Sequence, residues 1–119
     1  MSEPWPTELQ LTDAGTMLSI HFESGEQFIL SAEFLRVESP SAEVRGHGPG
    51  QEQLVYGKKL VSIKAIEPVG TYAVRLLFSD RHSSGIYTWN YLNKLGRERE
   101  TIWDSYIVKL ATQERSREP

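Results

Sequence analysis

The side chains best suited to chemistry lie together in one short run, Asp80-Arg81-His82-Ser83-Ser84. An imidazole two residues from a carboxylate can share a metal ion with it, or can act as a general base that the carboxylate orients. The run directly follows the strongest predicted strand, so the plainer interpretation is a polar turn in which Asp80 caps its own backbone. The spacing alone favours this plainer interpretation.

The other patterns that can support catalysis are incomplete. A non-haem iron site needs a His-x-Asp pair and a distant second histidine, but the order here is reversed and only His21 and His47 remain. The glycine-rich run at residues 46–50 is interrupted by Pro49 and lacks the Gly-Lys-Ser/Thr ending of a phosphate loop. No serine lies in a Gly-x-Ser-x-Gly elbow. We therefore predict no catalytic residue and no enzyme, with a small-molecule enzyme as the least favoured alternative.

The overall composition is that of one ordinary globular domain. The chain has 119 residues, 39% of them hydrophobic and 24% charged, with a net charge of −3 and a pI near 5.6. A nucleic-acid-binding domain usually carries a basic field that neutralises phosphates, so we expect no nucleic-acid partner. No apolar run approaches the roughly 20 residues that span a bilayer, so we expect no membrane association.

The chain has no cysteine. It can therefore form neither a disulfide nor a thiolate metal site, and the lack of disulfides favours a reducing compartment. The first 15 residues are polar and lack the apolar segment of a signal peptide. We expect a cytoplasmic protein.

The hydrophobic pattern predicts an α+β fold with one small, mainly antiparallel sheet. Alternation of apolar and polar residues predicts strands over Leu18–Phe22, Gln27–Leu30, Leu60–Ile66 and Tyr72–Phe78. Three-to-four-residue spacing and capping residues predict helices over Ala32–Val37, Trp89–Leu95 and about Arg97–Gln113. Ser31 and Thr88 are the expected N-caps, and Gly96 is the expected end of the second helix. The C-terminal helices are expected to bury Trp89, Leu92, Trp103, Ile107 and Leu110.

These elements predict a single domain between two loose ends. We expect a flexible N-terminal arm at residues 1–10, the folded domain with its C-terminal helix at residues 11–113, and a flexible tail at residues 114–119. The glycine-rich stretch at residues 46–50 is expected to be a flexible loop within the domain.

A longer pattern of dissimilar residues resembles a known family. It consists of Leu35-Arg36-Val37-x-Ser39-Pro40-Ser41-Ala42-Glu43-Val44, Pro68-Val69-Gly70-x-Tyr72-Ala73 and Phe78-Ser79-Asp80-x-His82-x-x-Gly85-Ile86-Tyr87-x-Trp89-x-Tyr91-Leu92-x-x-Leu95-Gly96. At this spacing the chain resembles the uncharacterised family similar to the N-terminal domain of gamma-butyrobetaine hydroxylase, here as a stand-alone domain of unknown function. The resemblance covers about residues 11–96.

In the hydroxylases, the similar domain precedes the oxygenase barrel and binds zinc through three cysteines and one histidine. The resemblance places these four ligand positions at Ser39, Ser41, Val44 and His82. Serine hydroxyls are poor zinc ligands and valine is none, so we expect no metal and no cofactor here. Arg81 also stands where the resemblance leads us to expect a glycine, which puts the tight turn before the histidine in doubt.

The resemblance further implies an accessory role, because the domain is also similar to one appended to P-loop iron–sulfur carrier proteins. Our first hypothesis is a non-catalytic accessory module that docks with an unidentified protein partner. Its possible binding surface comprises Arg36, Glu43, Asp80, Arg81, His82 and Ser83. The alternative is a metal-binding domain, linked to iron–sulfur or oxygenase systems, in which His82 acts with Asp80, Glu43 or His47.

Overall fold

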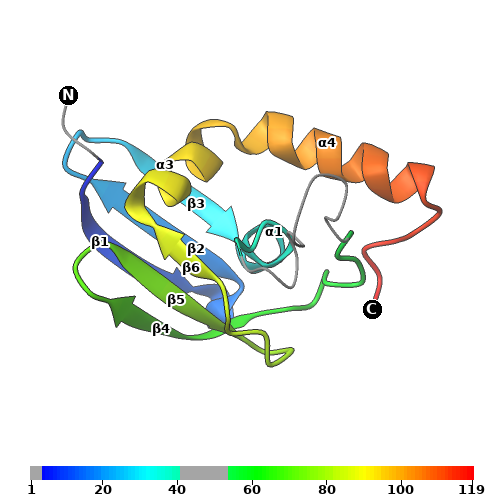
Figure 1. The fold of residues 1–119 in the computed structure, drawn as a ribbon, viewed down its shortest axis with the longest axis horizontal. Coiled ribbons are helices and arrows are strands. Elements are labelled where there is room, and N and C mark those ends of the chain that lie inside the picture. The colour runs from blue at the N-terminus through cyan, green and yellow to red at the C-terminus, as the bar shows by residue number, and fades with distance from the viewer. Residues whose placement is uncertain (1–3, 41–53) are drawn as a thin grey trace.

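The computed structural model describes residues 4–40 and 54–119, which form two small sheets and three α-helices (Figure 1). The strands are β1 (Pro6–Thr12), β2 (Met17–Phe22), β3 (Gln27–Ser31), β4 (Ile63–Val69), β5 (Ala73–Phe78) and β6 (Ile86–Thr88). The helices are α1 (Ala32–Val37), α3 (Trp89–Arg97) and α4 (Arg99–Thr112). This architecture confirms the predicted α+β class. The loop predicted at residues 46–50 lies outside the described residues.

The first sheet is antiparallel and has the strand order β1-β2-β3. It corrects the prediction of a flexible arm at residues 1–10, because residues 6–10 belong to β1 and pair with β2. Leu9 and Leu11 pack against the core, so this segment has the apolar anchors that an arm lacks. Pro6 stands at the first position of the strand, where its missing N–H costs least.

The second sheet is also antiparallel and has the order β4-β5-β6. The prediction of a single sheet is thereby corrected to two, since no pairing joins them among the described strands. The sheets meet where Gly15 approaches β4. Gly15 has a φ of +84°, and a Cβ there would lie 2.3 Å from the carbonyl oxygen of Ile63, so a side chain cannot fit.

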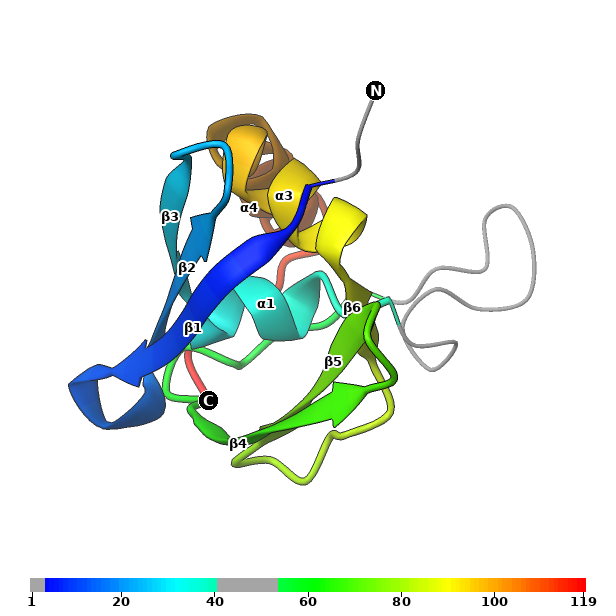
Figure 2. The same cartoon turned by 90° about the vertical axis from the view of Figure 1, so that its left-hand side faces the viewer.

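Figure 2 shows α1 between the two sheets, where its apolar side chains complete one core. Both predicted N-caps are confirmed: the Ser31 hydroxyl accepts from the Phe34 N–H at 3.0 Å, and the Thr88 hydroxyl accepts from the Tyr91 N–H at 3.1 Å. The fully buried large residues come from both sheets and from α1 and α3, and they include Leu18, Ile20, Leu30, Phe34, Leu35, Leu76, Tyr87, Leu92 and Leu95.

The predicted helix end at Gly96 is wrong, because α3 continues to Arg97. A Cβ at residue 96 would lie 2.4 Å from the ring of Phe28. The glycine therefore permits close packing of α3 against β3 and is not needed for a left-handed turn. None of the helices within residues 4–40 and 54–119 has the length and apolar character that crossing a membrane requires.

Helix α4 packs through a narrow apolar stripe. Tyr106 and Leu110 are buried in a second small cluster with Val37 of α1, and Trp103 is partly buried beside them. The predicted burial of Leu92 and Leu110 is thus confirmed, while Trp89 and Trp103 are only partly buried. Ile107 is 38% exposed, so its predicted burial is wrong. It follows Tyr106 directly, and successive helical residues point about 100° apart.

The C-terminal tail predicted to be flexible at residues 114–119 is held against the fold. The Arg117 guanidinium donates to both carboxylate oxygens of Glu33, from Nε at 2.8 Å and from Nη2 at 2.7 Å, and it lies over the ring of Trp103. Glu33 is buried in the first turn of α1. The N–H groups of Gly57 and Lys59 also donate to backbone carbonyls of the tail, each at 3.0 Å. These bonds correct the prediction of a loose tail.

Candidate functional site

The Asp80 turn follows β5 and is closed by its own backbone. The N–H of Phe78 donates to the carbonyl of His82 at 3.0 Å, and the N–H of Arg81 donates to the carbonyl of Phe78 at the same distance. Arg81 adopts a φ of +73°, the left-handed conformation that favours glycine. The tight turn, which the arginine had put in doubt, is therefore present. Asp80 Oδ1 accepts from the His82 N–H at 3.1 Å, so the carboxylate does cap its own turn.

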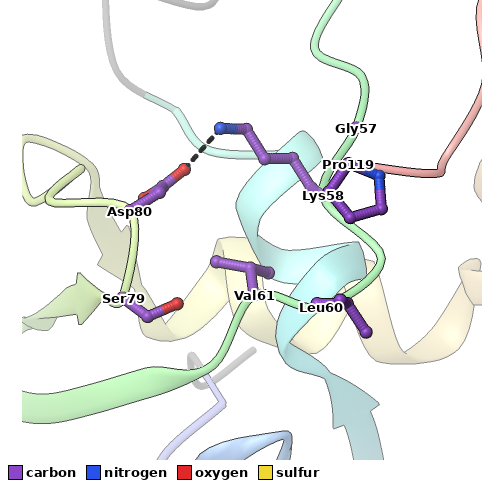
Figure 3. Close-up of a pocket in the computed structure, with 7 residues that line it drawn as sticks. All are labelled: Gly57, Lys58, Leu60, Val61, Ser79, Asp80 and Pro119. Atoms are coloured by element: carbon purple, nitrogen blue, oxygen red, sulfur yellow. Dashed lines mark ion pairs between the residues drawn. The ribbon is translucent and has the colours of Figure 1, made fainter.

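Two cations converge on the other oxygen of the same carboxylate. Arg36 Nε donates to Asp80 Oδ2 at 2.8 Å, and Lys58 Nζ lies 2.7 Å from the same atom, as Figure 3 shows for the lysine. The side chains are only 11% (Arg36), 20% (Asp80) and 25% (Lys58) exposed. Sequence reasoning joined Arg36 to Asp80 but missed Lys58. Lys58 lies just before a predicted strand, in a stretch with no periodic pattern that marks it.

The bonds to Asp80 outweigh the cost of its burial. Burial by itself raises the pKa of the carboxyl, but the bonds from Lys58, from the His82 N–H and from Arg36 lower the pKa to about 2. Asp80 is therefore ionised at neutral pH.

Arg36 keeps one donor that the site does not use. Its Nη1 is buried and has no hydrogen-bond partner within the part of the chain that the structure describes. An ionised donor removed from water without an acceptor is costly. The cluster of Arg36, Lys58 and Asp80 thus has more donors than acceptors and one positive charge in excess.

His82 lies beneath the turn and not on its surface. It is 7% exposed, and its Nε2 lies 2.9 Å from the hydroxyl of Ser39, which is fully buried. A Cβ at Gly85 would lie 2.3 Å from the same hydroxyl, so glycine leaves the room that this bond needs. The prediction that His82 contributes to an exposed polar surface is therefore wrong, because its ring is packed against Phe78 and bonded within the fold.

Two tyrosines fix the end of α1, which carries Arg36 and leads to Ser39. The Tyr87 hydroxyl donates to the carbonyl of Leu35, and the Tyr91 hydroxyl donates to the carbonyl of Glu38. Both acceptors lie at the C-terminal end of α1, where the helix itself leaves carbonyls unpaired. Sequence reasoning gave neither hydroxyl a role.

The surface beside the turn has an exposed apolar residue next to the charged cluster. Arg81, Ser83 and Ser84 are exposed, and Leu60 is 73% exposed. An open hollow of about 210 Å³ lies there, lined by Gly57, Lys58, Leu60, Val61, Ser79, Asp80 and Pro119 (Figure 3). Of the predicted surface, the structure brings together Arg36, Asp80, Arg81 and Ser83, while Glu43 lies outside the described residues.

The sequence model for the family described as gamma-butyrobetaine hydroxylase-like, N-terminal, matches residues 9–93. The chain belongs to this family. The match confirms the resemblance read from the residues. No curated protein matches the chain.

Three solved structures are similar to this chain over three quarters of its length or more. One NMR solution structure of a protein is 42% identical, covers 99% of this chain and 93% of that chain, and has a TM-score of 0.85. A second is 47% identical, with coverage of 98% and 86% and a TM-score of 0.83. A crystal structure of a protein of unknown function from the DUF971 family of Acidithiobacillus ferrooxidans is 38% identical, with coverage of 76% and 91% and a TM-score of 0.64. This is a family of unknown function.

The residues at the four positions that the resemblance assigns to zinc ligands do not fit a zinc ion. Of the four positions, Ser39 and His82 are described, and they bond to each other through a hydroxyl and an imidazole. Ser41 and Val44 lie outside the described residues. The serine side chain offers a second hydroxyl, and the valine side chain has no atom that can bind a metal. Within residues 4–40 and 54–119, no three His, Cys, Asp or Glu side chains are grouped to hold a metal. Ser39 and His82 instead form a buried hydrogen bond that supports the Asp80 turn.

Proposed function

We propose that this chain is a non-catalytic docking module that binds another protein in the cytoplasm. The observation that carries the proposal is the contrast between the Asp80 turn and the surface beside it. The polar groups of the turn are bonded within the fold, whereas Leu60 next to them is 73% exposed. A rigid polar rim beside an exposed apolar side chain has the anatomy of a protein interface.

The rigidity of the turn supports docking. Asp80 is held by Arg36 of α1 and by Lys58, while His82 is held by Ser39. The exposed side chain of Arg81 therefore extends from a backbone that is fixed on both sides. A surface ordered in advance loses less conformational entropy when it binds, so more of the contact energy remains as affinity.

The burial of the candidate acid–base groups supports the absence of catalysis. His82 is 7% exposed and is not among the residues that line the hollow, so a substrate there does not meet its imidazole. Asp80 has a pKa of about 2, far below the value near the working pH that suits a general base. The hollow is open, whereas small-molecule sites enclose most of their ligand.

The charge of the chain supports a protein partner over a nucleic acid. A net charge of −3 repels a phosphate backbone, and the basic groups at the site are too few to reverse this. The side chain of Leu60 and the aliphatic part of Lys58 offer apolar contact area to a partner side chain.

The experiment is co-purification from the source cells with a tag at the N-terminus, because the C-terminal tail is bonded to the fold. Leu60→Ser removes the exposed apolar contact of the site. Val108→Ser is the matched control, since Val108 is 63% exposed on α4 and lies outside the hollow. We expect at least tenfold less of a specific partner with Leu60→Ser and no change with Val108→Ser, with thermal unfolding midpoints equal to that of the unmodified chain. Equal recovery of every protein from all three chains would contradict the docking proposal.

A further inference from the structure

Two arginines of the C-terminal tail are each held by side chains of the folded domain. The Arg117 guanidinium donates to both carboxylate oxygens of Glu33, and its Cζ lies 5.3 Å from the centre of the Trp103 ring. The Cζ of Arg115 lies 4.9 Å from the centre of the Tyr56 ring. A carboxylate that accepts two parallel N–H bonds beside an aromatic face suits the planar guanidinium of arginine, and lysine cannot reproduce this arrangement.

Backbone bonds hold the tail between and at these arginines. The tail turns back from the end of α4 (Figure 1), and the Gly57 N–H donates to the carbonyl of Ser116 at 3.0 Å. The Lys59 N–H donates to the carbonyl of Arg117 at the same distance. Main-chain bonds of this kind add affinity for a peptide, while the pockets for its side chains give specificity. We call Glu33, Tyr56, Trp103 and the backbone of residues 57–59 the tail-binding surface.

The tail-binding surface is assembled by contacts that do not involve the tail. The Tyr106 hydroxyl donates to the carbonyl of Val55 at 2.8 Å and so ties α4 to the segment that leads to Tyr56. The Trp103 ring packs edge-on against Phe34 of α1 and also contacts Tyr106 on its own helix. These contacts can hold the surface in shape when the tail leaves it.

The tail has few anchors of its own. Its sequence, Glu-Arg-Ser-Arg-Glu-Pro, contains no large apolar side chain, and Arg117 is its one partly buried residue. Glu114, at its start, has a φ of +54°, a left-handed conformation that is costly without glycine. The main loss on release falls on Glu33, which is 7% exposed and would become a buried charge without a partner. An incoming arginine that replaces Arg117 removes this loss.

We propose that the tail-binding surface is a receptor for an Arg-x-Arg segment of a partner protein, which displaces the tail and takes over its contacts. The charge of the site agrees with a basic ligand, because release of the tail leaves the Glu33 carboxylate unpaired on a chain whose net charge is −3. A segment with lysines in place of the arginines has the same charge but lacks the planar donor fork. The inference goes beyond the docking function proposed for Leu60, which is not part of this surface.

The test is an NMR titration of the full ¹⁵N-labelled chain with two capped peptides of equal charge, Gly-Arg-Ser-Arg-Gly and Gly-Lys-Ser-Lys-Gly. The chain carries Arg117→Lys, which weakens the hold on the tail but keeps its charge. The signals followed are the amides of Gly57 and Lys59 and the indole N–H of Trp103. We expect saturable shifts with the arginine peptide and at least tenfold weaker binding of the lysine peptide. Equal binding of the two peptides, or no shift with the arginine peptide, would overturn the inference.

Two further variants locate the ligand on the surface. Glu33→Gln, added to Arg117→Lys, removes the carboxylate and should weaken binding of the arginine peptide at least tenfold. Glu67→Gln, added in the same way, is the matched control, because it loses the same charge and Glu67 pairs with Arg75 on the second sheet. Equal weakening by both substitutions would show that the peptide responds to net charge alone, and would contradict the receptor.

The unmodified chain measures the competition between the peptide and the tail, and this measurement needs no variant to fold. A tethered tail acts at an effective concentration on the order of mM. The arginine peptide should therefore bind at least tenfold more weakly than it binds Arg117→Lys, and the Nε–Hε signal of Arg117 should move as the tail leaves. Binding that leaves this signal unchanged would overturn the inference, because the peptide would then lie elsewhere.

The receptor and the docking function fail separately. If a partner depends on Leu60 in the co-purification but the arginine peptide does not bind, docking stands and the Arg-x-Arg receptor is wrong. If the arginine peptide binds through Glu33 but no partner is lost with Leu60→Ser, the receptor stands and docking at Leu60 is wrong.

Discussion

Helix α1 makes two ionic contacts, one turn apart, that differ in how completely their charges are matched. At its start, Glu33 meets one guanidinium, and Arg117 bonds both of its carboxylate oxygens. At its end, Arg36 and Lys58 share one oxygen of Asp80, and Nη1 of Arg36 has no partner among the described residues. The first contact is complete and serves the fold. The second holds the Asp80 turn through two cations on one carboxylate oxygen.

Breaking the matched contact should have the largest effect. Arg117→Ala leaves Glu33, whose side chain is 7% exposed, as a buried carboxylate without its partner. Removal of one member of a buried pair costs about 3–5 kcal/mol, and because the arginine side chain is 40% exposed we expect about 3 kcal/mol. Urea unfolding followed by circular dichroism measures the loss. Arg115→Ala is the charge-matched control in the same tail, and a loss as large in that variant would contradict the role given to Arg117.

The bond between Ser39 and His82, which supports the Asp80 turn, can be broken without changing the contact between Glu33 and Arg117. Gly85→Ala places a Cβ 2.3 Å from the Ser39 hydroxyl and forces apart the bond between Ser39 and His82. Overpacking of this kind costs about 1–3 kcal/mol, and we expect about 2 kcal/mol in urea unfolding. In a Ser39→Ala background the same substitution should cost less, because the clashing oxygen is gone. Equal costs in both backgrounds would show that the clash is not with Ser39.

Acid should weaken the contact at Asp80 as the pH falls toward 2. The pKa of Asp80 is lowered from 3.8 to about 2, so its contribution to stability is complete above pH 4 and is lost as the pH falls toward 2. A lowering of this size corresponds to about 2 kcal/mol. Urea unfolding at several pH values between 2 and 6 measures the free energy of unfolding of the unmodified chain and of Asp80→Asn. The difference between the two should shrink by that amount as the pH falls from 6 to 2. A constant difference across the range would mean that the carboxylate does not titrate as described.

The smallest effect on stability should come from Lys58, because Asp80 keeps a second cation when the lysine is removed. Lys58→Met leaves Asp80 paired with Arg36, so we expect a loss below about 1 kcal/mol, close to that of Lys59→Met. The same urea unfolding measurement compares the two. A loss near 3 kcal/mol would contradict this prediction and would show that the fold requires Lys58 as much as Arg117.

Local signals in the sequence predicted the regular elements well. Ser31 and Thr88 were recognised as caps because a hydroxyl that accepts a backbone N–H acts within one helical turn. Gly96 misled the prediction because its role depends on Phe28, which lies far away in the sequence. Strand β1 was missed for a related reason. Its apolar residues are buried only once β2 is beside it.

The candidate site was predicted in part. The errors concern burial and contacts between residues that lie far apart in the sequence. The family pattern led to Asp80, Arg36 and His82, but a pattern does not report burial, and His82 proved to be beneath the surface. Lys58 stands 22 positions before Asp80 in an irregular stretch, where no periodicity distinguishes it from the adjacent Lys59. The bond between Glu33 and Arg117 spans 84 positions and has no local signature at all.

That same separation has a consequence for synthesis on the ribosome. Glu33 is made early, and the guanidinium that neutralises it follows 84 positions later. At roughly 5–20 residues per second, the growing chain waits about 4–17 s before Arg117 is even added. During that interval the carboxylate cannot be buried as it is in the finished fold without a large penalty. The nascent domain should therefore keep the start of α1 open to water, and hence to chaperones, until Arg117 has been added.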